Sequence, residues 1–512
     1  MENILYYGDN LKVLREHIKD NSVDLIYLDP PFNSKADYNI LFKEPTGKPS
    51  EAQITAFEDT WHWTEETERT FQEIVEIAPA NVVEMIRAFR QFVGNNDVMA
   101  YLTMMCIRLL ELKRVLKDTG SIYLHCDPSA SHYLKIVMDT IFGKKNFRNE
   151  IVWCYKSRPV SKRYFCKKHD IIFFYSKTNE YYFDWKANLQ PLSPLTIKKY
   201  KYEDEIGMYR LVGRGIKGSP IKSAKDVDPK WEIEHPELVV RDYLKEGYPL
   251  EDYWFINIIN QSAKERLGYP TQKPEALLER IIKASADKDS IILDPFCGCG
   301  TTVAVAQRFK RNWIGIDITH LAINLIKLRL KGMYRLEPKK DYKIVGEPED
   351  LAGAMELALQ NRYQFQWWVL SLIDIKPYGD KKKGADTGID GVSHFMVGKD
   401  EYKKVIAQVK SGNVSVKDIR DFSHVLDREN AEIGIFVTLE QPTKPMITEA
   451  VSKGFYKSPD YKNKEFPKIQ ILTIEEILNG AAPGIPFLSP SYKKAQRANL
   501  TKDSQLKLLK RI

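Results

Sequence analysis

An apolar segment that runs directly into an acidic residue and two prolines places the tightest constraint on this chain. Residues 23–28 have the composition of a strand buried in a parallel sheet, and Asp29-Pro30-Pro31-Phe32 follows at once. The prolines fix φ at successive positions and remove two backbone donors. The strand would therefore end in a stiff corner whose polar groups only accept hydrogen bonds, at the end of the sheet where α/β proteins hold ligands. A plain turn remains an equally good interpretation of this motif alone.

A second buried strand, residues 290–293, leads into a glycine-rich turn and a helix. From position 294 the sequence reads Asp-Pro-Phe-Cys-Gly-Cys-Gly-Thr-Thr. Glycines at such a turn let a ligand approach the backbone, and the helix N-terminus favours a carboxylate or phosphate. The next strand, residues 313–316, ends in Asp317, where an acid can bind a ribose diol. The third glycine of the dinucleotide fingerprint is missing, and a glycine pair of this kind can be an ordinary tight turn. Combined with Asp317 and the Asp-Pro-Pro-Phe corner, it favours a nucleoside cofactor other than NAD.

Four motifs in this order resemble the β class of S-adenosylmethionine-dependent DNA amino-methyltransferases. That family carries Asp-Pro-Pro-Phe/Tyr before Phe-x-Gly-x-Gly, which stands here at residues 296–300. Its Gly-Asp-x-Leu element is matched at residues 8–11, and its Gly-Tyr-Pro-Thr-Gln-Lys-Pro segment at residues 268–274. The resemblance covers residues 1–335.

The resemblance implies methyl transfer from S-adenosylmethionine to adenine N6 in double-stranded DNA, with the base flipped out of the helix. Asp29 and the Pro30 carbonyl would accept hydrogen bonds from the amino group and aim its lone pair at the sulfonium methyl, with Pro31 stiffening the corner. Phe32 would stack on the base. Asp as the first motif residue favours adenine, because Ser-Pro-Pro is the usual signature of cytosine-N4 enzymes; cytosine N4 stays the alternative. The implied cofactor-binding residues are Asp9, Thr271, Lys273, Asp294, Phe296, Cys297, Gly298, Gly300, Thr301 and Asp317.

Composition sets looser limits. A length of 512 residues predicts two to four domains, and 77 basic against 69 acidic residues give a formal charge of +8, too small by itself to imply DNA. The six cysteines form no Cys-x-x-Cys pair, which favours a reducing compartment without a zinc site or disulfides. There is no membrane-spanning or signal-peptide pattern, so a cytoplasmic protein is expected. A homodimer is compatible with the sequence, which does not fix the oligomeric state.

Residues 155–262 break the alternation of strands and helices. Basic residues interleaved with aromatics between positions 156 and 169 suit DNA contact, although a charge run is often only a solvated face. The family's target recognition region occupies this interval. His125 follows another predicted strand, residues 121–124, and could touch the flipped base, but local hydrogen bonding is the commoner role of such a histidine. Residues 33–63 are predicted as a long loop over the active site.

The last third resembles the Mrr-like branch of the PD-(D/E)xK nuclease fold. A helix is predicted over residues 351–372, and Gly-Ile-Asp-Gly then precedes a strand that carries Gln408-x-Lys410. By resemblance, Asp390 and Gln408 would hold Mg²⁺, and Lys410 would orient the attacking water, although a carboxamide is a weaker Mg²⁺ ligand than a carboxylate. Two alternatives stay open: a DNA-binding remnant that does not cut, and a methylation-sensing nuclease as the main activity.

The expected fold class is α/β: a circularly permuted Rossmann-like methyltransferase domain with an inserted target recognition region, followed by a C-terminal α/β restriction-endonuclease-like domain. The expected division is residues 1–154 for the catalytic half, 155–262 for target recognition, 263–337 for the cofactor-binding half, 338–350 for a linker, 351–490 for the nuclease fold and 491–512 for a basic tail.

Overall fold

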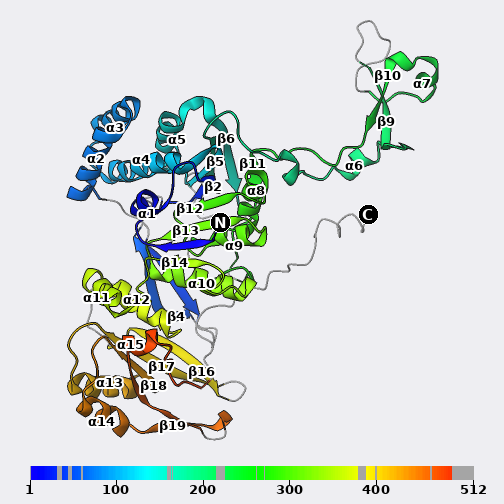
Figure 1. Ribbon diagram of the computed structural model, residues 1–512. Helices are drawn as coiled ribbons and strands as arrows, with labels where there is room; N and C mark the ends of the chain where they lie inside the picture. Colours follow the sequence, from blue (N-terminus) through cyan, green and yellow to red (C-terminus); the bar gives the residue numbers. More distant parts are fainter. Residues whose placement is uncertain are drawn as a thin grey trace. The chain divides into compact units, whose positions relative to one another are not determined.

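The computed structural model (Figure 1) describes residues 2–31, 37–43, 49–58, 62–157, 163, 165–214, 225–260, 262–269, 271–378, 388–397, 401–461 and 464–486, with backbone only in 37–43 and 49–58. Phe32, the basic residues 158 and 162, and the tail 491–512 lie outside the described residues. The chain forms two compact units, residues 1–182 with 253–512, and residues 183–252.

A nine-stranded sheet organises the first unit, in the order β11-β6-β7-β5-β2-β12-β13-β1-β14. Its strands are β1(Ile4–Tyr7), β2(Val23–Leu28), β5(Leu116–Cys126), β6(Phe147–Cys154), β7(His169–Ser176), β11(Tyr253–Phe255), β12(Ile291–Asp294), β13(Asn312–Asp317) and β14(Lys343–Val345). All neighbours from β5 to β14 are parallel, whereas β7 runs antiparallel to β5 and β6. The predicted α/β class is therefore confirmed.

Sheet order departs from chain order in the way that a permuted fold requires. β2 pairs with β12, although more than 260 residues separate them, with Leu25 opposite Ile292 and Ile26 opposite Leu293. Because both strands are parallel and adjacent, the acidic corners that follow them meet at one edge of the sheet. The pairing thus joins the two halves of the domain around Asp29 and Asp294.

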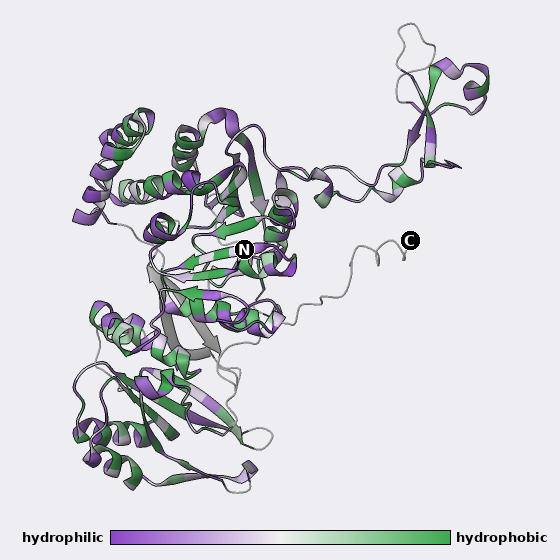
Figure 2. Ribbon diagram, viewed as in Figure 1, coloured by the Kyte–Doolittle hydropathy of each residue, from purple (hydrophilic) through white to green (hydrophobic). Residues whose placement is uncertain are grey.

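Helices cover this sheet and supply most of its core. They are α1(Asn10–His17), α2(Glu65–Ile77), α3(Ala80–Val93), α4(Asp97–Val115), α5(Ser131–Met138), α8(Glu275–Ser285), α9(Thr301–Arg308) and α10(His320–Tyr334), with η1(Asp139–Gly143) and η2(Lys144–Asn146) after α5. α4 is buried on most of its surface, as a central helix with few polar positions must be. Figure 2 shows hydrophobic residues concentrated on the strands beneath these helices.

Residues 183–252 form the second unit. It is built on the antiparallel strands β8(Tyr202–Asp204), β9(Gly207–Gly213) and β10(Val239–Tyr243), with η3(Trp185–Asn188), α6(Pro194–Ile197), α7(Lys230–Glu234) and η4(Pro236–Leu238). Its small core consists of Tyr209, Leu211 and Val239. In the first unit, the segment expected as a loop over the active site contains a hairpin, β3(Asp37–Lys43) and β4(Pro49–Glu58).

A five-stranded mixed sheet forms the C-terminal domain, in the order β15-β16-β17-β18-β21. Its strands are β15(Lys376–Pro377), β16(Gly391–Val397), β17(Glu401–Lys410), β18(Ala431–Thr438) and β21(Ile469–Thr473), with the hairpin β19(Phe455–Ser458), η5(Pro459–Tyr461), β20(Lys464–Pro467). Its helices are α11(Leu351–Gln360), α12(Arg362–Leu372), α13(Val416–Arg428), α14(Lys444–Ser452) and α15(Ile474–Leu478).

Two features near the domain boundary differ from expectation. The single helix predicted over residues 351–372 is two helices, because Asn361 has extended backbone and its side chain caps α12 by accepting from Gln364 N at 3.1 Å. The stretch expected as a linker, residues 338–350, contains β14, which pairs with β1. Among the described residues, every helix is too short or too polar to cross a membrane.

Candidate active site

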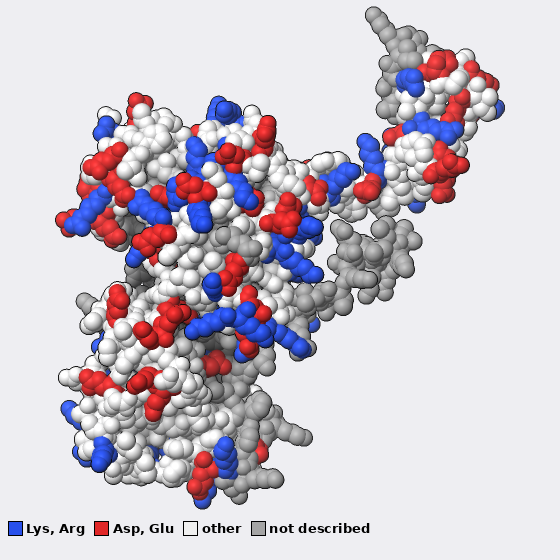
Figure 3. All heavy atoms as spheres, viewed as in Figure 1, with Lys and Arg blue, Asp and Glu red and all other residues white. Residues whose placement is uncertain are grey.

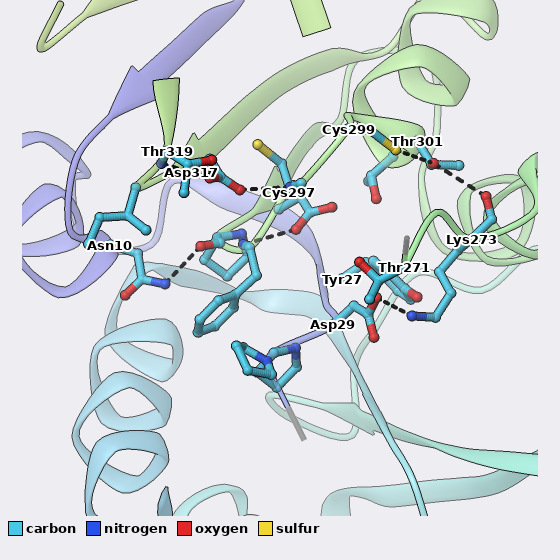
Figure 4. A pocket seen from close by; sticks show the side chains of 18 of the residues that line it. Asn10, Tyr27, Asp29, Thr271, Lys273, Cys297, Cys299, Thr301, Asp317 and Thr319 are labelled. Atoms are coloured by element: carbon cyan, nitrogen blue, oxygen red, sulfur yellow. Dashed lines mark hydrogen bonds and ion pairs between the residues drawn. The ribbon is translucent and has the colours of Figure 1, made fainter. Parts of the chain in front are cut away.

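A cavity of about 280 Å³ lies where β2, β12 and β13 end (Figure 4). Predicted site residues from segments far apart in the chain line it together: Asp9, Asp29, Pro30, Pro31, Thr271, Lys273, Asp294, Phe296, Cys297, Gly298, Thr301 and Asp317. Gly300 belongs to the same turn but not to the cavity wall. Phe32, expected to stack on a base, lies outside the described residues. The structure brings the predicted residues together, and their individual roles stay predictions.

Asp29 forms an ion pair that the sequence did not reveal. Lys273 Nζ contacts Asp29 Oδ2, and both side chains are about one-seventh exposed, at 13% and 15%. The other oxygen, Asp29 Oδ1, is buried and has no hydrogen-bond partner among the described residues. A buried carboxylate oxygen without a donor is costly. This corner is therefore an acceptor whose two oxygens have different environments: one faces an ammonium group, and the other has an unfilled hydrogen-bonding capacity.

The two glycines of the turn after β12 are required for different reasons. Gly298 has φ +49°, and a Cβ there would lie 3.3 Å from the Tyr269 ring. Gly300 has φ +71°, and a Cβ there would lie 2.7 Å from Ile326 of α10. Both positions need the left-handed backbone that glycine adopts without strain. At Gly300, close packing of the turn against α10 explains the glycine without any ligand, whereas Gly298 lines the cavity.

Two carboxyl groups at the strand ends are held by local donors. Asp317 Oδ2 accepts from Gly298 N at 2.9 Å, and its Oδ1 accepts from Thr319 N and Oγ1, both at 2.9 Å. Asp294, which is 3% exposed, accepts from Phe296 N at 3.1 Å. Burial raises the pKa of Asp294 to about 7 and that of Asp317 to about 6, with these hydrogen bonds acting in the opposite direction.

These raised pKa values predict that the free protein becomes more stable as the pH falls from about 7 toward 5. The folded state then binds protons at Asp294 and Asp317, while the unfolded chain, with carboxyl pKa values near ~4, does not. Each group contributes at most about 1.4 kcal/mol per pH unit in this window. Thermal melting measured across the window should show a smaller pH dependence in Asp294→Asn than in the wild type. An unchanged dependence in this variant would contradict the expected titration.

Asn10 of α1 and Arg108 of α4 also line the cavity and were not predicted, and they contact the predicted Asp9. Asp9 caps α1 by accepting from Leu11 N at 3.0 Å, and its other oxygen accepts from Arg108 Nη2 at 2.7 Å. Arg108 Nε also donates to Asn10 Oδ1 at 2.6 Å, while Asn10 Nδ2 donates to the Pro295 carbonyl at 2.8 Å. This chain of bonds ties the N-terminal segment to the turn after β12. No sequence signal marks Arg108, since it lies mid-helix.

A buried arginine holds the turn from behind. Arg329 of α10 is 2% exposed and donates to the Cys299 carbonyl and Thr301 Oγ1, both at 3.2 Å. It also pairs with Glu275 at 2.6 Å, the residue that follows the Thr-Gln-Lys-Pro segment. The ion pair links this segment to the turn. Because both side chains are largely buried, loss of either partner would leave an uncompensated charge.

A helix of the C-terminal domain packs against the same turn. Trp367 of α12 forms one hydrophobic cluster with Tyr269, Cys299, Leu321 and Leu325. The backbone N of His320, at the start of α10, donates to Gln364 Oε1 of α12 at 3.1 Å. The cavity-lining residues Tyr269 and Cys299 therefore rest on a side chain from outside their own domain.

Truncation of this side chain is expected to disturb both stability and the cavity. Trp367→Ala should destabilise the protein by about 3–5 kcal/mol, as for other buried tryptophans, and weaken ligand binding through Tyr269 and Cys299. Thermal melting and binding calorimetry measure the two effects. Tyr363→Ala, at a half-exposed position of the same helix, is the matched control. Equal behaviour of the two variants would exclude this support.

The predicted nuclease residues lie close together at the five-stranded sheet of the C-terminal domain. Asp390 precedes β16, and its Oδ2 accepts from Val409 N at 2.7 Å. Gln408 and Lys410 share one face of β17, and the Gln408 amide lies 3.7 Å from where a Gly388 Cβ would stand. Within the described part of the chain, no group of three or more His, Cys, Asp or Glu side chains could hold a metal ion. Glu356, an acidic residue on the preceding helix α11, is exposed and accepts a hydrogen bond from Gln360 Nε2 at 2.8 Å.

Comparison with known proteins identifies the family. Residues 23–328 match the family model of the N6/N4 DNA methylases, described as DNA methylase, and residues 360–455 match a restriction endonuclease family of the Mrr type. The first match spans more than half of the sequence. The chain belongs to the DNA methylase family, as its motif order predicted, and carries an Mrr-type restriction endonuclease domain.

Individual relatives agree with this assignment. The chain is 28% identical over 347 residues to the Mod subunit of the type III restriction-modification enzyme StyLTI of Salmonella typhimurium LT2, covering 59% of this chain and 49% of that subunit. It is 30% identical over 262 residues to the type II methyltransferase M.EcaI of Enterobacter cloacae, covering 45% of this chain and 57% of that enzyme. The chain thus spans about half the length of these two relatives.

Among solved structures, the cytosine-N4-specific PvuII DNA methyltransferase is similar with a TM-score of 0.36 and 15% identity, covering 64% of this chain and 85% of that one. The M1.HpyAVI complex with S-adenosylmethionine has a TM-score of 0.31 and 16% identity, covering 64% of this chain and 98% of that one. Both TM-scores are low, and the assignment rests on the sequence families.

Proposed function

We propose that residues 1–337 transfer a methyl group from S-adenosylmethionine to N6 of adenine in double-stranded DNA. The observation that carries this proposal is the position of Asp29: its carboxylate stands on the wall of the cavity that also contains the glycine turn and Asp317. An acceptor and a nucleoside-binding turn around one space are what amino methylation requires. The matching family model is that of the DNA methylases, and the two relatives are a type II methyltransferase and a subunit of a restriction-modification enzyme, which supports DNA as the substrate.

The described residues suit S-adenosylmethionine, which supplies an electrophilic methyl group when bound. Gly298 leaves room for a ligand beside Tyr269, and Asp317 would bind the ribose hydroxyls with lone pairs that its protein donors leave free. Asp9 would lie near the adenine of the cofactor, as the family resemblance implies. Thr271, Phe296, Cys297 and Thr301 are further lining residues for this role. Asp294, which is buried, shapes the turn from the inside.

In the reaction, Asp29 would accept a hydrogen bond from the exocyclic amino group of the target base. The Pro30 carbonyl would accept the second, and the lone pair of the nitrogen would then point toward the methyl group. Charge develops on the nitrogen during transfer, and the carboxylate stabilises it. Pro31 adds no donor that could compete for these acceptors. Phe32 would stack on the base that has been flipped out.

The ion pair with Lys273 means that the Asp29 carboxylate has a protein partner before a base binds. With the ammonium on Oδ2, one oxygen of Asp29 is already engaged. An amino group that enters the cavity would replace the lysine or share the oxygen with it. Lys273 therefore occupies Oδ2 when no base is bound.

Base identity is the finer part of the proposal. An aspartate at position 29 favours adenine over cytosine, and cytosine N4 is the alternative. We infer that residues 155–262 recognise the target sequence. On most of the face drawn in Figure 3, basic and acidic side chains are interspersed. Of the basic residues between positions 156 and 169, the structure describes Lys156, Arg163, Lys167 and Lys168.

Methyl transfer is tested with labelled S-adenosylmethionine and duplex DNA. Incorporated label, followed by nucleoside chromatography, should appear in N6-methyladenine. Label in N4-methylcytosine would replace adenine by cytosine in the proposal, and no label in DNA would overturn it. Single-molecule sequencing of DNA from cells that express the protein then gives the target sequence.

We further propose that residues 351–490 cut DNA with Mg²⁺, supported by the restriction endonuclease match over residues 360–455. Asp390 and Gln408 would hold the ion, with Lys410 beside the attacked phosphate. One carboxylate suffices for Mg²⁺ where water and substrate phosphate complete the shell. A domain that senses methylation before it cuts is the alternative form of this proposal.

A further inference from the structure

His125 lies directly behind the corner that carries Asp29. It is the penultimate residue of β5, next to β2 in the sheet, and its side chain is completely buried. It does not line the cavity, whereas its neighbours Tyr27 and Asp29 do (Figure 4). The histidine is therefore placed to act on the carboxylate and not on the substrate.

Both ring nitrogens of His125 face groups that fix its hydrogen-bonding role. Nε2 lies 3.1 Å from Asp170 Oδ2 of β7, and a carboxylate oxygen requires a donor there. Nδ1 lies 2.9 Å from Tyr27 Oη and 3.5 Å from Asp29 Oδ1. The Trp153 ring of β6 meets the imidazole edge-on at 5.4 Å, which keeps it in this plane.

The unsatisfied oxygen of Asp29 decides the state of Nδ1. Within the part of the chain that the structure describes, Asp29 Oδ1 is buried without a hydrogen-bond partner, and His125 Nδ1 lies 3.5 Å from it. A proton on Nδ1 would give that oxygen a donor, while Tyr27 Oη accepts from the same N–H or turns its own hydroxyl away. Because Nε2 already donates to Asp170, the ring would then be the imidazolium.

The surrounding charges favour that cation. Among the described residues, the carboxylates of Asp29, just after β2, and of Asp170 on β7 face the ring, while the ammonium group of Lys273 contacts Asp29. Tyr155 donates to the other oxygen of Asp170 at 3.1 Å, and Asp127 and Cys126 stand on the same chain segment as His125. A positive charge on His125 brings Asp29, Asp170, Lys273 and the ring to zero net charge, which suits a buried group.

Hydrogen bonding also holds Asp170 in its anionic form. Burial alone would raise the pKa of Asp170, but the hydrogen bond and charge of His125, with help from Lys273 and Tyr155, bring it below its usual value. The hydroxyl of Tyr27 stays protonated, because burial and the nearby carboxylates raise its pKa well above the ordinary value.

We propose that His125, held by Asp170, is a positioning residue that fixes the Asp29 carboxylate through Oδ1 and leaves Oδ2 for the amino group of the base. This inference rests on the methyl transfer proposed above. Without this contact between His125 Nδ1 and Asp29 Oδ1, the carboxyl group of Asp29 can rotate about its Cβ–Cγ bond and lose its alignment. Misplacement of a reacting group by about 1 Å can cost roughly 100-fold in rate.

Variants at position 125 separate positioning from simple packing. His125→Asn keeps an N–H donor at the place of Nδ1, whereas His125→Gln places its amide toward Asp170. The turnover number for DNA methylation should fall about 10- to 100-fold in His125→Gln and remain within about threefold in His125→Asn, with S-adenosylmethionine binding unchanged in both. His132→Asn, on the exposed face of α5, is the control for expression and folding.

The protonation state is read independently of activity. Nitrogen-15 NMR of histidine-labelled protein should show a proton on His125 Nδ1, beside Asp29 Oδ1, as well as on Nε2, beside Asp170. Equal turnover in His125→Gln and wild type, or a neutral ring in the wild type, overturns the inference. A wild-type protein that transfers no methyl group overturns the proposed function instead. The NMR result then still tests the contact between His125 and Asp29.

Discussion

Replacing Asp29 by alanine is expected to lower methyl transfer to duplex DNA by at least about 100-fold. The variant loses the acceptor that would bind the amino group and stabilise charge on nitrogen, and loss of one preorganised electrostatic group typically costs roughly 100- to 1,000-fold. Cofactor affinity should change little, because the glycine turn and Asp317 are bonded to each other and not to Asp29. Labelled methyl incorporation and binding calorimetry measure the two quantities.

Two further variants sharpen this test. Asp29→Asn keeps the shape and one carbonyl acceptor but removes the charge, so its rate should lie between wild type and Asp29→Ala. Asp118→Ala removes an exposed acid elsewhere on the same sheet and should leave the rate unchanged. Wild-type activity in Asp29→Ala, or a parallel loss of cofactor binding, would contradict the role assigned to Asp29.

Lys410→Ala is expected to reduce Mg²⁺-dependent DNA cleavage by at least about 100-fold and to leave methylation intact. Lys410 lies on the same face of β17 as Gln408, at the end of the strand beside Asp390. Removal of its cation would take away the group that orients the attacking water or stabilises charge on the phosphate. A nicking assay on supercoiled DNA, with and without Mg²⁺, measures the effect.

Lys403→Ala, a surface substitution on the same strand, is the matched control and should cut normally. Asp390→Ala is the less direct variant, because its carboxylate also accepts from Val409 N and supports the strand. Equal cutting by wild type, Lys410→Ala and Asp390→Ala would place cleavage elsewhere. No cutting by the wild type, with methylation retained, would favour the non-cleaving remnant.

Local patterns predicted the sheet because the strands that matter are short, apolar and followed by unusual residues. The predicted strand 290–293 is observed as Ile291–Asp294, and the strand 313–316 as Asn312–Asp317. Each is buried on both faces, so its sequence is nearly continuous in apolar residues. Motif order then indicated the permuted connection, which the pairing of β2 with β12 realises.

Long-range partners were beyond the reach of such patterns. Nothing local distinguishes Arg108 or Arg329 from a surface arginine, yet one binds Asp9 and the other bonds the turn at Cys299. Lys273 was predicted as a cofactor residue, but its pairing with Asp29 depends on two segments 244 residues apart. The break at Asn361 was missed because an apolar stripe continues across it while a single capping side chain ends the helix.

The contact of Trp367 with the methyltransferase domain makes the stability of that domain depend on the C-terminal domain. A deletion that removed α12 would uncover Tyr269, Leu321 and Leu325, which that tryptophan now shields from water. Loss of the C-terminal domain would thus expose apolar side chains of the methyltransferase domain and destabilise it. A chain that lost the domain proposed to cut DNA would therefore also have a less stable domain for the proposed methylation, so the two domains would tend to be kept or lost together.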